Sequence, residues 1–168
     1  GFPKKIGAVN DHADIISQAT ENIIATLSRE LNEKTGFSYV VVTYNPKEEI
    51  DIEDYSNRLY EKWGIGKKGI DEGVLLLVLP EQRKIRFETG YGAESFLTDA
   101  FLSSIINERI IPEIQKGSFD RAIGSGSASI IGTVAQHYNV TISGIRAPQH
   151  KTNTDSGQLP LPAVIFMV

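Results

Sequence analysis

The chain has 168 residues and a formal net charge of −4. With 40% hydrophobic and 23% charged residues, it has the ordinary composition of one globular domain with tails. The negative charge excludes the basic surface of a nucleic-acid-binding protein and favours cations over polyanions as ligands. The chain has no cysteine, which excludes disulfides, thiolate zinc sites, iron–sulfur clusters and cysteine nucleophiles.

Periodicity and capping residues predict alternating helices and strands. Ile16, Ile23, Leu27 and Leu31 recur at helical spacing around the candidate cap Ser17. The predicted elements, in chain order, are a helix over 17–35, a strand over 37–44, a helix over 52–63, strands over 73–80 and 84–89, a helix from 99 to about 111, and a helix from about 118 to 139.

The order of these elements predicts the fold class. The strands over 37–44 and 73–80 flank a helix, which gives a right-handed parallel βαβ unit. A short loop then joins the second strand to 84–89 as an antiparallel hairpin. Helices on both faces complete an α/β fold, a three-layer α/β/α sandwich with a small mixed β-sheet. Asp51 is a candidate cap for the helix over 52–63, and Thr98 is a candidate cap for the helix that begins at 99. Pro112 is expected to restart or kink the second of these helices.

Composition divides the chain into three parts. Residues 1–8 are predicted to be an N-terminal tail, 9–140 the domain, and 141–168 a flexible polar linker that ends in an apolar segment. That segment, 163–168, is far shorter than the about 20 residues that a transmembrane helix needs. It is either the start of a membrane span or a disordered apolar tail, and the residues leave both open.

Two acidic loops are predicted to meet at one end of the sheet. Because the last two strands are antiparallel, the start of one lies beside the end of the other. This brings Asp71 and Glu72 close to the loop 90–99, with the sequence GYGAESFLTD. That loop carries Glu94 and Asp99, and gathered carboxylates are most stable around calcium or magnesium. The alternative is that these carboxylates only cap turns and helices or are solvated.

Other motifs carry weaker signals. GIGKKG over 64–69 matches a dinucleotide-binding fingerprint, but it follows a predicted helix and precedes a strand, which is the reverse of that fold. Its glycines are expected to end the helix, with Lys67 and Lys68 as solvated charges or as weak ligands for an anion. Tyr91 is expected to pack as an ordinary aromatic residue, or else to point into a pocket.

Asp11 and Asp14 lie close together in the stretch NDHAD over 10–14. We interpret this stretch as a solvated turn, and a second acidic cluster is the alternative. By topology it lies at the end of the sheet opposite Asp71, unless the N-terminal segment folds back.

Four motifs together resemble the TPM domain family. They are VNDHADIIS over 9–17, WGIG over 63–66, DEGVLLLV over 71–78 and GYGAESFLTD over 90–99. The similarity extends from about residue 9 to residue 138. Family members include a thylakoid-lumen protein of photosystem II repair, an auxiliary protein of a nematode acetylcholine receptor and many bacterial envelope proteins. The resemblance implies an α/β/α sandwich that binds divalent cations, calcium in particular.

The resemblance also implies ligands and a location. Glu72 stands where family members often have a small residue or asparagine, which leaves its role open. Ser95 stands where they often have glycine. Bacterial members commonly carry a signal peptide and a membrane span, which implies an extracytoplasmic location and favours a truncated anchor at 163–168. The family's acidic motif positions fall on Asp11, Asp71, Glu94 and Asp99.

The expected function is a calcium-binding domain, with magnesium as the alternative ion. It is expected to be a monomeric domain of a cell-envelope protein that acts through an envelope or membrane protein partner. The alternative is a metal-dependent acid phosphatase, because that activity is attributed to the plant branch of the family. The chain lacks a cysteine nucleophile, an aspartate-x-aspartate loop and a histidine phosphatase motif, so a metal-held water would have to attack. A third hypothesis is an interaction module without a cation.

Overall fold

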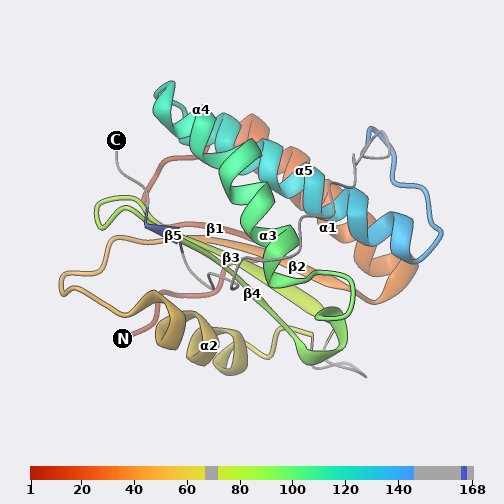
Figure 1. The fold of residues 1–168 in the computed structure, drawn as a ribbon, viewed down its shortest axis with the longest axis horizontal. Helices are drawn as coiled ribbons and strands as arrows, with labels where there is room; N and C mark the ends of the chain where they lie inside the picture. The colour runs from red at the N-terminus through yellow and green to blue at the C-terminus, as the bar shows by residue number, and fades with distance from the viewer. Residues whose placement is uncertain (67–71, 146–163, 166–168) are drawn as a thin grey trace.

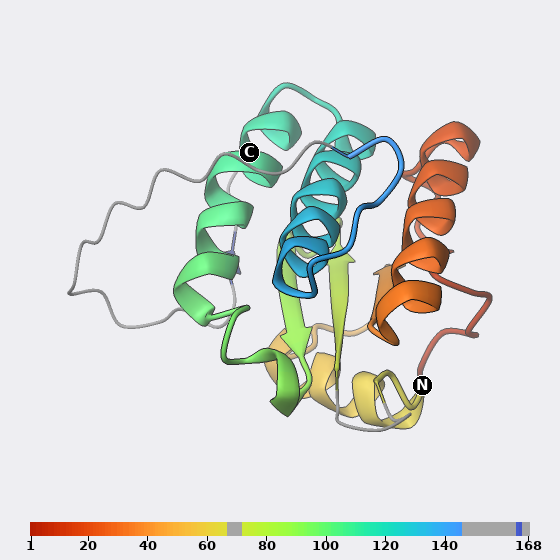
Figure 2. The same ribbon diagram turned by 90° about the vertical axis from the view of Figure 1, so that its right-hand side faces the viewer.

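The computed structural model describes residues 1–66, 72–145 and 164–165. Its main elements are β1 (Val9–Asp11), α1 (Gln18–Thr35), β2 (Ser38–Thr43), α2 (Ile52–Lys62), β3 (Gly73–Leu79), β4 (Lys84–Thr89), α3 (Asp99–Ile105), α4 (Ile111–Gln115), α5 (Phe119–His137) and β5 (Val164–Ile165). One sheet separates α2 from the other helices, which lie together on the opposite face (Figures 1 and 2). The predicted three-layer α/β/α sandwich is confirmed.

The sheet has five strands in the order β1-β2-β3-β4-β5. β1, β2 and β3 are parallel, and β4 is antiparallel to both β3 and β5. The predicted parallel pair and hairpin therefore form the centre of the sheet, and β1 and β5 extend it at the two edges. β1 has only three residues, too few to show a period of two.

Asn10 explains why so short a strand as β1 is stable. Its side chain is fully buried. Its carbonyl oxygen accepts hydrogen bonds from the backbone N–H groups of Ile6 (2.6 Å) and Gly7 (3.1 Å). Its amide donates to the carbonyl oxygens of Gly7 (2.9 Å) and Val41 (3.1 Å). All of the amide's polar groups have partners, so the buried side chain fixes β1 against β2.

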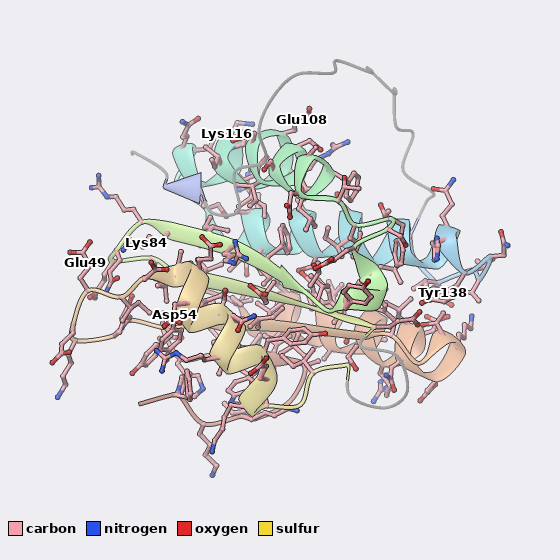
Figure 3. The ribbon with its side chains drawn as sticks, turned by 60° about the horizontal axis from the view of Figure 1, so that its bottom comes forward. Glu49, Asp54, Lys84, Glu108, Lys116 and Tyr138 are labelled. Atoms are coloured by element: carbon pink, nitrogen blue, oxygen red, sulfur yellow. The ribbon has the colours of Figure 1, made fainter. Side chains whose placement is uncertain are left out.

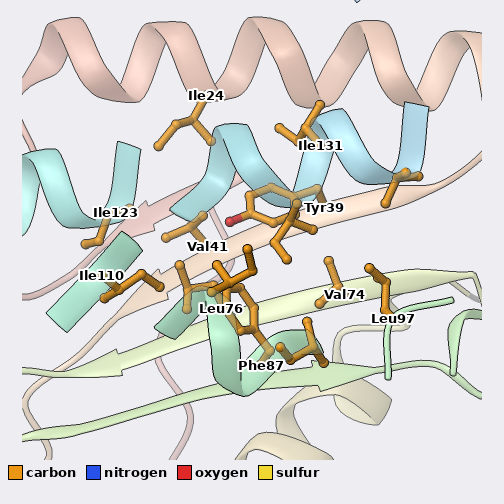
Figure 4. Close-up of a cluster of buried hydrophobic side chains, with 14 of the residues drawn as sticks. Ile24, Tyr39, Val41, Val74, Leu76, Phe87, Leu97, Ile110, Ile123 and Ile131 are labelled. Carbon is orange, nitrogen blue, oxygen red and sulfur yellow. The ribbon is translucent and has the colours of Figure 1, made fainter. Parts of the chain in front are cut away.

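Apolar side chains fill the space on both faces of the sheet. All seven residues of β3 are buried, as expected for a central strand covered on both sides. The larger core packs the sheet against α1, α3 and α5, and Figure 4 shows Leu76 and Phe87 of the sheet facing Ile131 of α5. The prediction for α1 needs one correction, because Ile24 is buried whereas Ile23 is 60% exposed.

Side-chain caps begin the helices where the sequence places them. The Ser17 hydroxyl accepts a hydrogen bond from the backbone N–H of Thr20 (3.2 Å) at the start of α1. Asp51 begins α2 in the same way (3.0 Å) and Thr98 begins α3 (3.2 Å). Each cap satisfies a donor that the first helical turn leaves without a partner, which is why these boundaries follow from local sequence.

The helix predicted from 99 to about 111 is not continuous. α3 ends at Ile105, a π-helical segment, η2, covers Ile106–Ile110, and α4 begins at Ile111. Pro112 lies in the first turn of α4, where a proline is tolerated because its position needs no N–H donor. The restart near Pro112 agrees with the prediction, but no sequence signal marked the π-helical segment.

Residues on both sides of the predicted domain, before residue 9 and after residue 140, pack against it. At the N-terminus, the ring of Phe2 packs on Tyr55 of α2, with 5.0 Å between ring centroids. At the other end, Ile142 is 3% exposed in the core, so packing continues beyond the predicted boundary at residue 140. No helix among the described residues has the length and apolar character needed to cross a membrane.

Candidate functional site

The two loops that were predicted to meet do meet. The backbone N–H of Gly90 donates a hydrogen bond to the carbonyl oxygen of Gly73, with an N–O distance of 3.0 Å. One residue further along each strand, Val74 pairs with Thr89. The start of β3 and the loop after β4 therefore share one end of the sheet, as the hairpin topology requires.

Gly66 allows a third segment to approach this end of the sheet. The residue has a φ of 72°, which disfavours any side chain. A Cβ atom at Gly66 would lie 2.8 Å from the Tyr60 hydroxyl oxygen and 3.1 Å from the Glu72 backbone. The glycine thus lets the turn after α2 lie against the start of β3. This agrees with the prediction that the glycines at 64 and 66 end the helix.

Glu72 is half-buried and lies beside Tyr138, at the end of α5. The Tyr138 hydroxyl oxygen is buried and has no hydrogen bond of standard geometry among the described residues. Burial raises the pKa of Tyr138, and the neighbouring Glu72 carboxylate raises it further. The Tyr138 ring contacts Phe96 edge to face, with 6.1 Å between centroids. Figure 3 shows Tyr138 at the opposite end of the molecule from Lys84, which begins β4.

Glu94 and Asp99 are available for binding. Both side chains are exposed, and neither takes part in an ion pair or side-chain hydrogen bond within the described part of the chain. Asp99 is the first residue of α3, where the helix dipole favours a negative charge. Tyr91, in the same loop, is 83% exposed, so the expectation that it packs is wrong.

Asp11 lies at the other end of the sheet, as the topology predicted. Its carboxylate accepts hydrogen bonds from the Thr43 hydroxyl (2.6 Å) and from the backbone N–H groups of Ile15 (3.1 Å) and Ile16 (2.9 Å). These bonds fasten the turn between β1 and α1 to the end of β2. The structure does not bring Asp11 together with Glu94, and it gives Asp11 a stabilising role.

Three acidic residues, Asp11, Asp14 and Glu21, lie near one another after β1. Burial, together with the Asp11 and Asp14 carboxylates, raises the pKa of Glu21. Asp14 itself is exposed and adopts a φ of 54°. These three residues share a region but do not form a metal-binding group, because no cluster of three His, Asp or Glu residues in the described ranges could hold a metal ion.

Asp71, Lys67 and Lys68 lie outside the described residues. The cation and anion ligands predicted at these positions therefore stay predictions. A cation site at the shared end of the sheet would need Asp71 or backbone carbonyl oxygens in addition to Glu94 and Asp99.

Sequence reasoning missed a polar pocket between α2 and β4. The pocket has a volume of about 360 Å³. Glu88 on β4 is 8% exposed and accepts hydrogen bonds from Arg86 Nε (2.9 Å) and the Ser56 hydroxyl (3.0 Å). The sequence does show Arg86 and Glu88 alternating on β4, and acidic residues in the first turn of α2. It does not show that α2 packs against β4, which is the contact that brings these residues together. The pocket is lined by Asp51, Glu53, Asp54, Asn57, Arg86 and Glu88.

Comparison with known proteins agrees with this architecture. The family model of the TPM domain matches residues 9–133, which is most of the chain. The chain therefore belongs to the TPM domain family. The comparison with curated proteins found no match.

Three solved structures of bacterial proteins have the same fold. The N-terminal domain of a P. gingivalis protein is 28% identical, with a TM-score of 0.73 over 86% of this chain and 88% of that one. The BA42 protein of Bizionia argentinensis is 18% identical, with a TM-score of 0.62 over 75% and 86% of the two chains. The N-terminal domain of the cg2496 protein of Corynebacterium glutamicum is 14% identical, with a TM-score of 0.58 over 91% and 95%.

Proposed function

We propose that this chain is a divalent-cation-binding domain of an extracytoplasmic protein and that it acts through a partner protein. The observation that carries the proposal is the hydrogen bond from Gly90 to Gly73, because it joins the loop after β4 to the start of β3. Proteins with a TPM domain are commonly extracytoplasmic, which supports the proposed location.

Calcium is the cation that fits this donor set best, with magnesium as the alternative. Glu94 and Asp99 offer oxygen ligands that are not engaged in ion pairs within the described part of the chain. Asp71 would add a carboxylate from the other loop. Calcium accepts 6–8 oxygen ligands in flexible geometry, so backbone carbonyls and water would complete the shell. The bound ion would then order both loops for contact with a partner.

Calorimetric titration of calcium chloride into chelator-treated protein tests the cation site. We expect saturable heat, and an affinity at least about tenfold lower in Asp71→Asn or Glu94→Gln protein, since each loses one charged ligand. Glu33→Gln, which removes an exposed carboxylate from the far part of α1, is the matched control. Absence of heat, or equal affinity in all four proteins, contradicts the proposal.

A hydrolysis assay separates this function from the acid phosphatase predicted as an alternative. The calcium-loaded and magnesium-loaded proteins are incubated with an aryl phosphate at acidic and neutral pH. The proposal expects no turnover. Metal-dependent turnover that is lost in both Glu94→Gln and Asp99→Asn protein would make the chain an enzyme and replace a purely binding role.

A further inference from the structure

Two buried side chains fasten the loop 90–99 to the core. Ala93 is fully buried and Leu97 is 1% exposed. The backbone N–H groups of Phe96 and Leu97 both donate hydrogen bonds to the Ala93 carbonyl oxygen, at 3.2 and 2.8 Å. Phe96 itself is only partly buried and packs at the border of the core. Its contacts therefore decide how the outer part of the loop is held.

Phe96 stacks on the last residue of α5. The rings of Phe96 and His137 are nearly parallel, with an interplanar angle of 8° and 3.7 Å between centroids. Tyr138 meets Phe96 edge to face, with 6.1 Å between centroids. Phe37, which is fully buried before β2, is tilted against Phe96 at 6.3 Å. Three segments that are distant in sequence therefore meet at one ring, and together their residues form an aromatic clasp: Phe37, Phe96, His137 and Tyr138.

The outer contact of the aromatic clasp forms at the surface of the domain. His137 is exposed, although one face of its ring lies on Phe96. Aromatic pairs are stabilised by their stacking geometry beyond the area that they bury. A contact between a partly buried and an exposed ring opens at a lower free-energy cost than the packing of the core. The stack can therefore form or break while the domain stays folded.

The aromatic clasp also reaches the start of β3. Tyr138, which contacts Phe96, lies beside Glu72, the residue that precedes this strand. The end of α5 thus contacts chain on both sides of the hydrogen bond that joins Gly90 to Gly73. This is the position from which one helix end can affect both of the loops that meet there.

We propose that the stack of Phe96 on His137 fixes the loop 90–99 in its cation-binding conformation, so that the end of α5 regulates cation affinity at Glu94 and Asp99. The inference rests on the proposed function, since it concerns the same two carboxylates. Glu94 lies two residues before Phe96 and Asp99 three residues after it, so release of the Phe96 ring frees the backbone on both sides. Phe96 and His137 are positioning residues, which act through the loop and not as ligands.

The physical basis of the regulation is the cost of ordering the loop. When the stack is broken, only a fraction of the molecules hold the loop 90–99 in the binding conformation. The apparent affinity for the ion falls by that fraction, although the ligands themselves are unchanged. A residue that only stabilised the folded domain would leave the affinity of the folded protein as it was.

Calorimetric titration of calcium chloride into chelator-treated variants, all at one pH, tests the proposal. His137→Ala removes the stack at an exposed position and should raise the dissociation constant about threefold to tenfold. Phe96→Leu should weaken binding to the same extent, because it removes the same contact. His137→Phe keeps a ring against Phe96 and should bind calcium within about twofold of the original chain. The matched control is His12→Ala, at an exposed residue just after β1, which should bind as the original chain does.

Proton NMR supplies a second measurement that a purely structural role would not change. The chain has three histidines, so the ring signals of His137 are those missing from the spectrum of His137→Phe protein. Saturating calcium should shift these signals in the original chain, because coupling between two sites is reciprocal. In Phe96→Leu protein saturated with calcium, the shift should be lost.

Three results would overturn the regulation and leave the cation site in place. They are unchanged calcium affinity in His137→Ala protein, equal weakening in His137→Ala and His137→Phe proteins, and a calcium-induced shift of the His137 signals that persists in Phe96→Leu protein. Absence of heat in the original chain contradicts the proposed function itself and the regulation with it. If Phe96→Leu protein does not fold, as judged by circular dichroism, the two substitutions at the exposed residue 137 still decide the outcome.

Discussion

Single carboxylates in this domain have different roles although their sequence contexts look alike. Asp11 is the last residue of β1, at the carboxyl end of the parallel strands, and accepts three hydrogen bonds from its surroundings. Glu94 and Asp99 are exposed at the opposite end. A carboxylate whose oxygens are already hydrogen-bonded to the protein must lose those bonds to bind a cation. We therefore assign Asp11 to the stability of the fold, and we keep Glu94 and Asp99 as the proposed cation ligands.

The first prediction concerns Asp11. Asp11→Ala should lower the free energy of unfolding by about 2–3 kcal/mol, because it leaves two backbone N–H groups and a hydroxyl without their acceptor. Asp14→Ala, at an exposed position in the same turn, should change it by less than about 1 kcal/mol. Urea unfolding monitored by circular dichroism measures both. If the loss in Asp11→Ala protein appears only in calcium and not in chelator, Asp11 is a cation ligand after all.

At the scale of elements, small residues of α5 set how closely other helices approach. A Cβ atom at Gly126 would lie 2.7 Å from Ile110 Cδ1, and Ile110 of η2 is fully buried. A Cβ atom at Gly124 would meet only Thr20 Cγ2, at an ordinary 3.5 Å. Two glycines in one helix are thus present for different reasons, although the sequence GSGS shows them as equivalent.

This difference leads to opposite predictions for two alanine substitutions. Gly124→Ala should raise the free energy of unfolding by up to about 1 kcal/mol, since alanine is the better helix former. Gly126→Ala should lower it by about 1–2 kcal/mol, because overlap with Ile110 outweighs the same gain. The added substitution Ile110→Val should restore part of the loss, as a double-mutant cycle would show. Equal effects of the two alanine substitutions would contradict the packing argument.

The sequence predicted those elements whose determinants are local. Ser17, Asp51 and Thr98 begin their helices because each cap satisfies donors in its own first turn. β1 was missed because its stability comes from the buried side chain of Asn10 and from pairing with β2, which is distant in sequence. The π-helical segment, which packs against α5, was missed because its own residues continue the helical pattern without a visible break.

The two candidate sites also differ in how far the sequence predicts them. The meeting of the loops near Gly73 and Gly90 followed from the hairpin, because antiparallel pairing fixes which strand ends are neighbours. The pocket between α2 and β4 could not be predicted, because it depends on which face of β4 the helix covers. Glu72 could not be placed either, since its neighbour Tyr138 comes from the far end of α5.

At the scale of the whole molecule, each of the three layers contains a tyrosine that is buried or, in the case of Tyr138, partly buried. Tyr39 on β2 lies in the core against α5, where its hydroxyl and that of Ser127 are 2.7 Å apart. Tyr55 lies in the α2 layer and donates a hydrogen bond to the Gly1 carbonyl oxygen (3.2 Å). Burial raises the pKa of both, and it also raises the pKa of Tyr138 at the end of α5. Every layer therefore contains a phenol that must stay protonated in the folded state.

The last prediction is that the domain loses stability at alkaline pH. An unfolded tyrosine releases its proton near its ordinary pKa of 10.0, whereas burial raises the pKa of Tyr55 in the folded state to about 12. Between these values the folded state binds more protons than the unfolded state, so the free energy of unfolding falls as pH rises. Below pH 10 the contribution of these phenols is fully present. Urea unfolding at a series of pH values, with tyrosinate absorbance as a second signal, measures the decline.

Two variants assign that decline to particular residues. In Tyr55→Phe and Tyr138→Phe proteins the fall in unfolding free energy above pH 10 should be less steep than in the original chain, because each variant removes one phenol with a raised pKa. At neutral pH the two variants should differ because of the hydrogen bonds that they lose. The Tyr55 hydroxyl donates one hydrogen bond, whereas the Tyr138 hydroxyl has none of standard geometry among the described residues. A difference between variant and original that is the same at about pH 8 and about pH 11 would show that these phenols do not control alkaline stability.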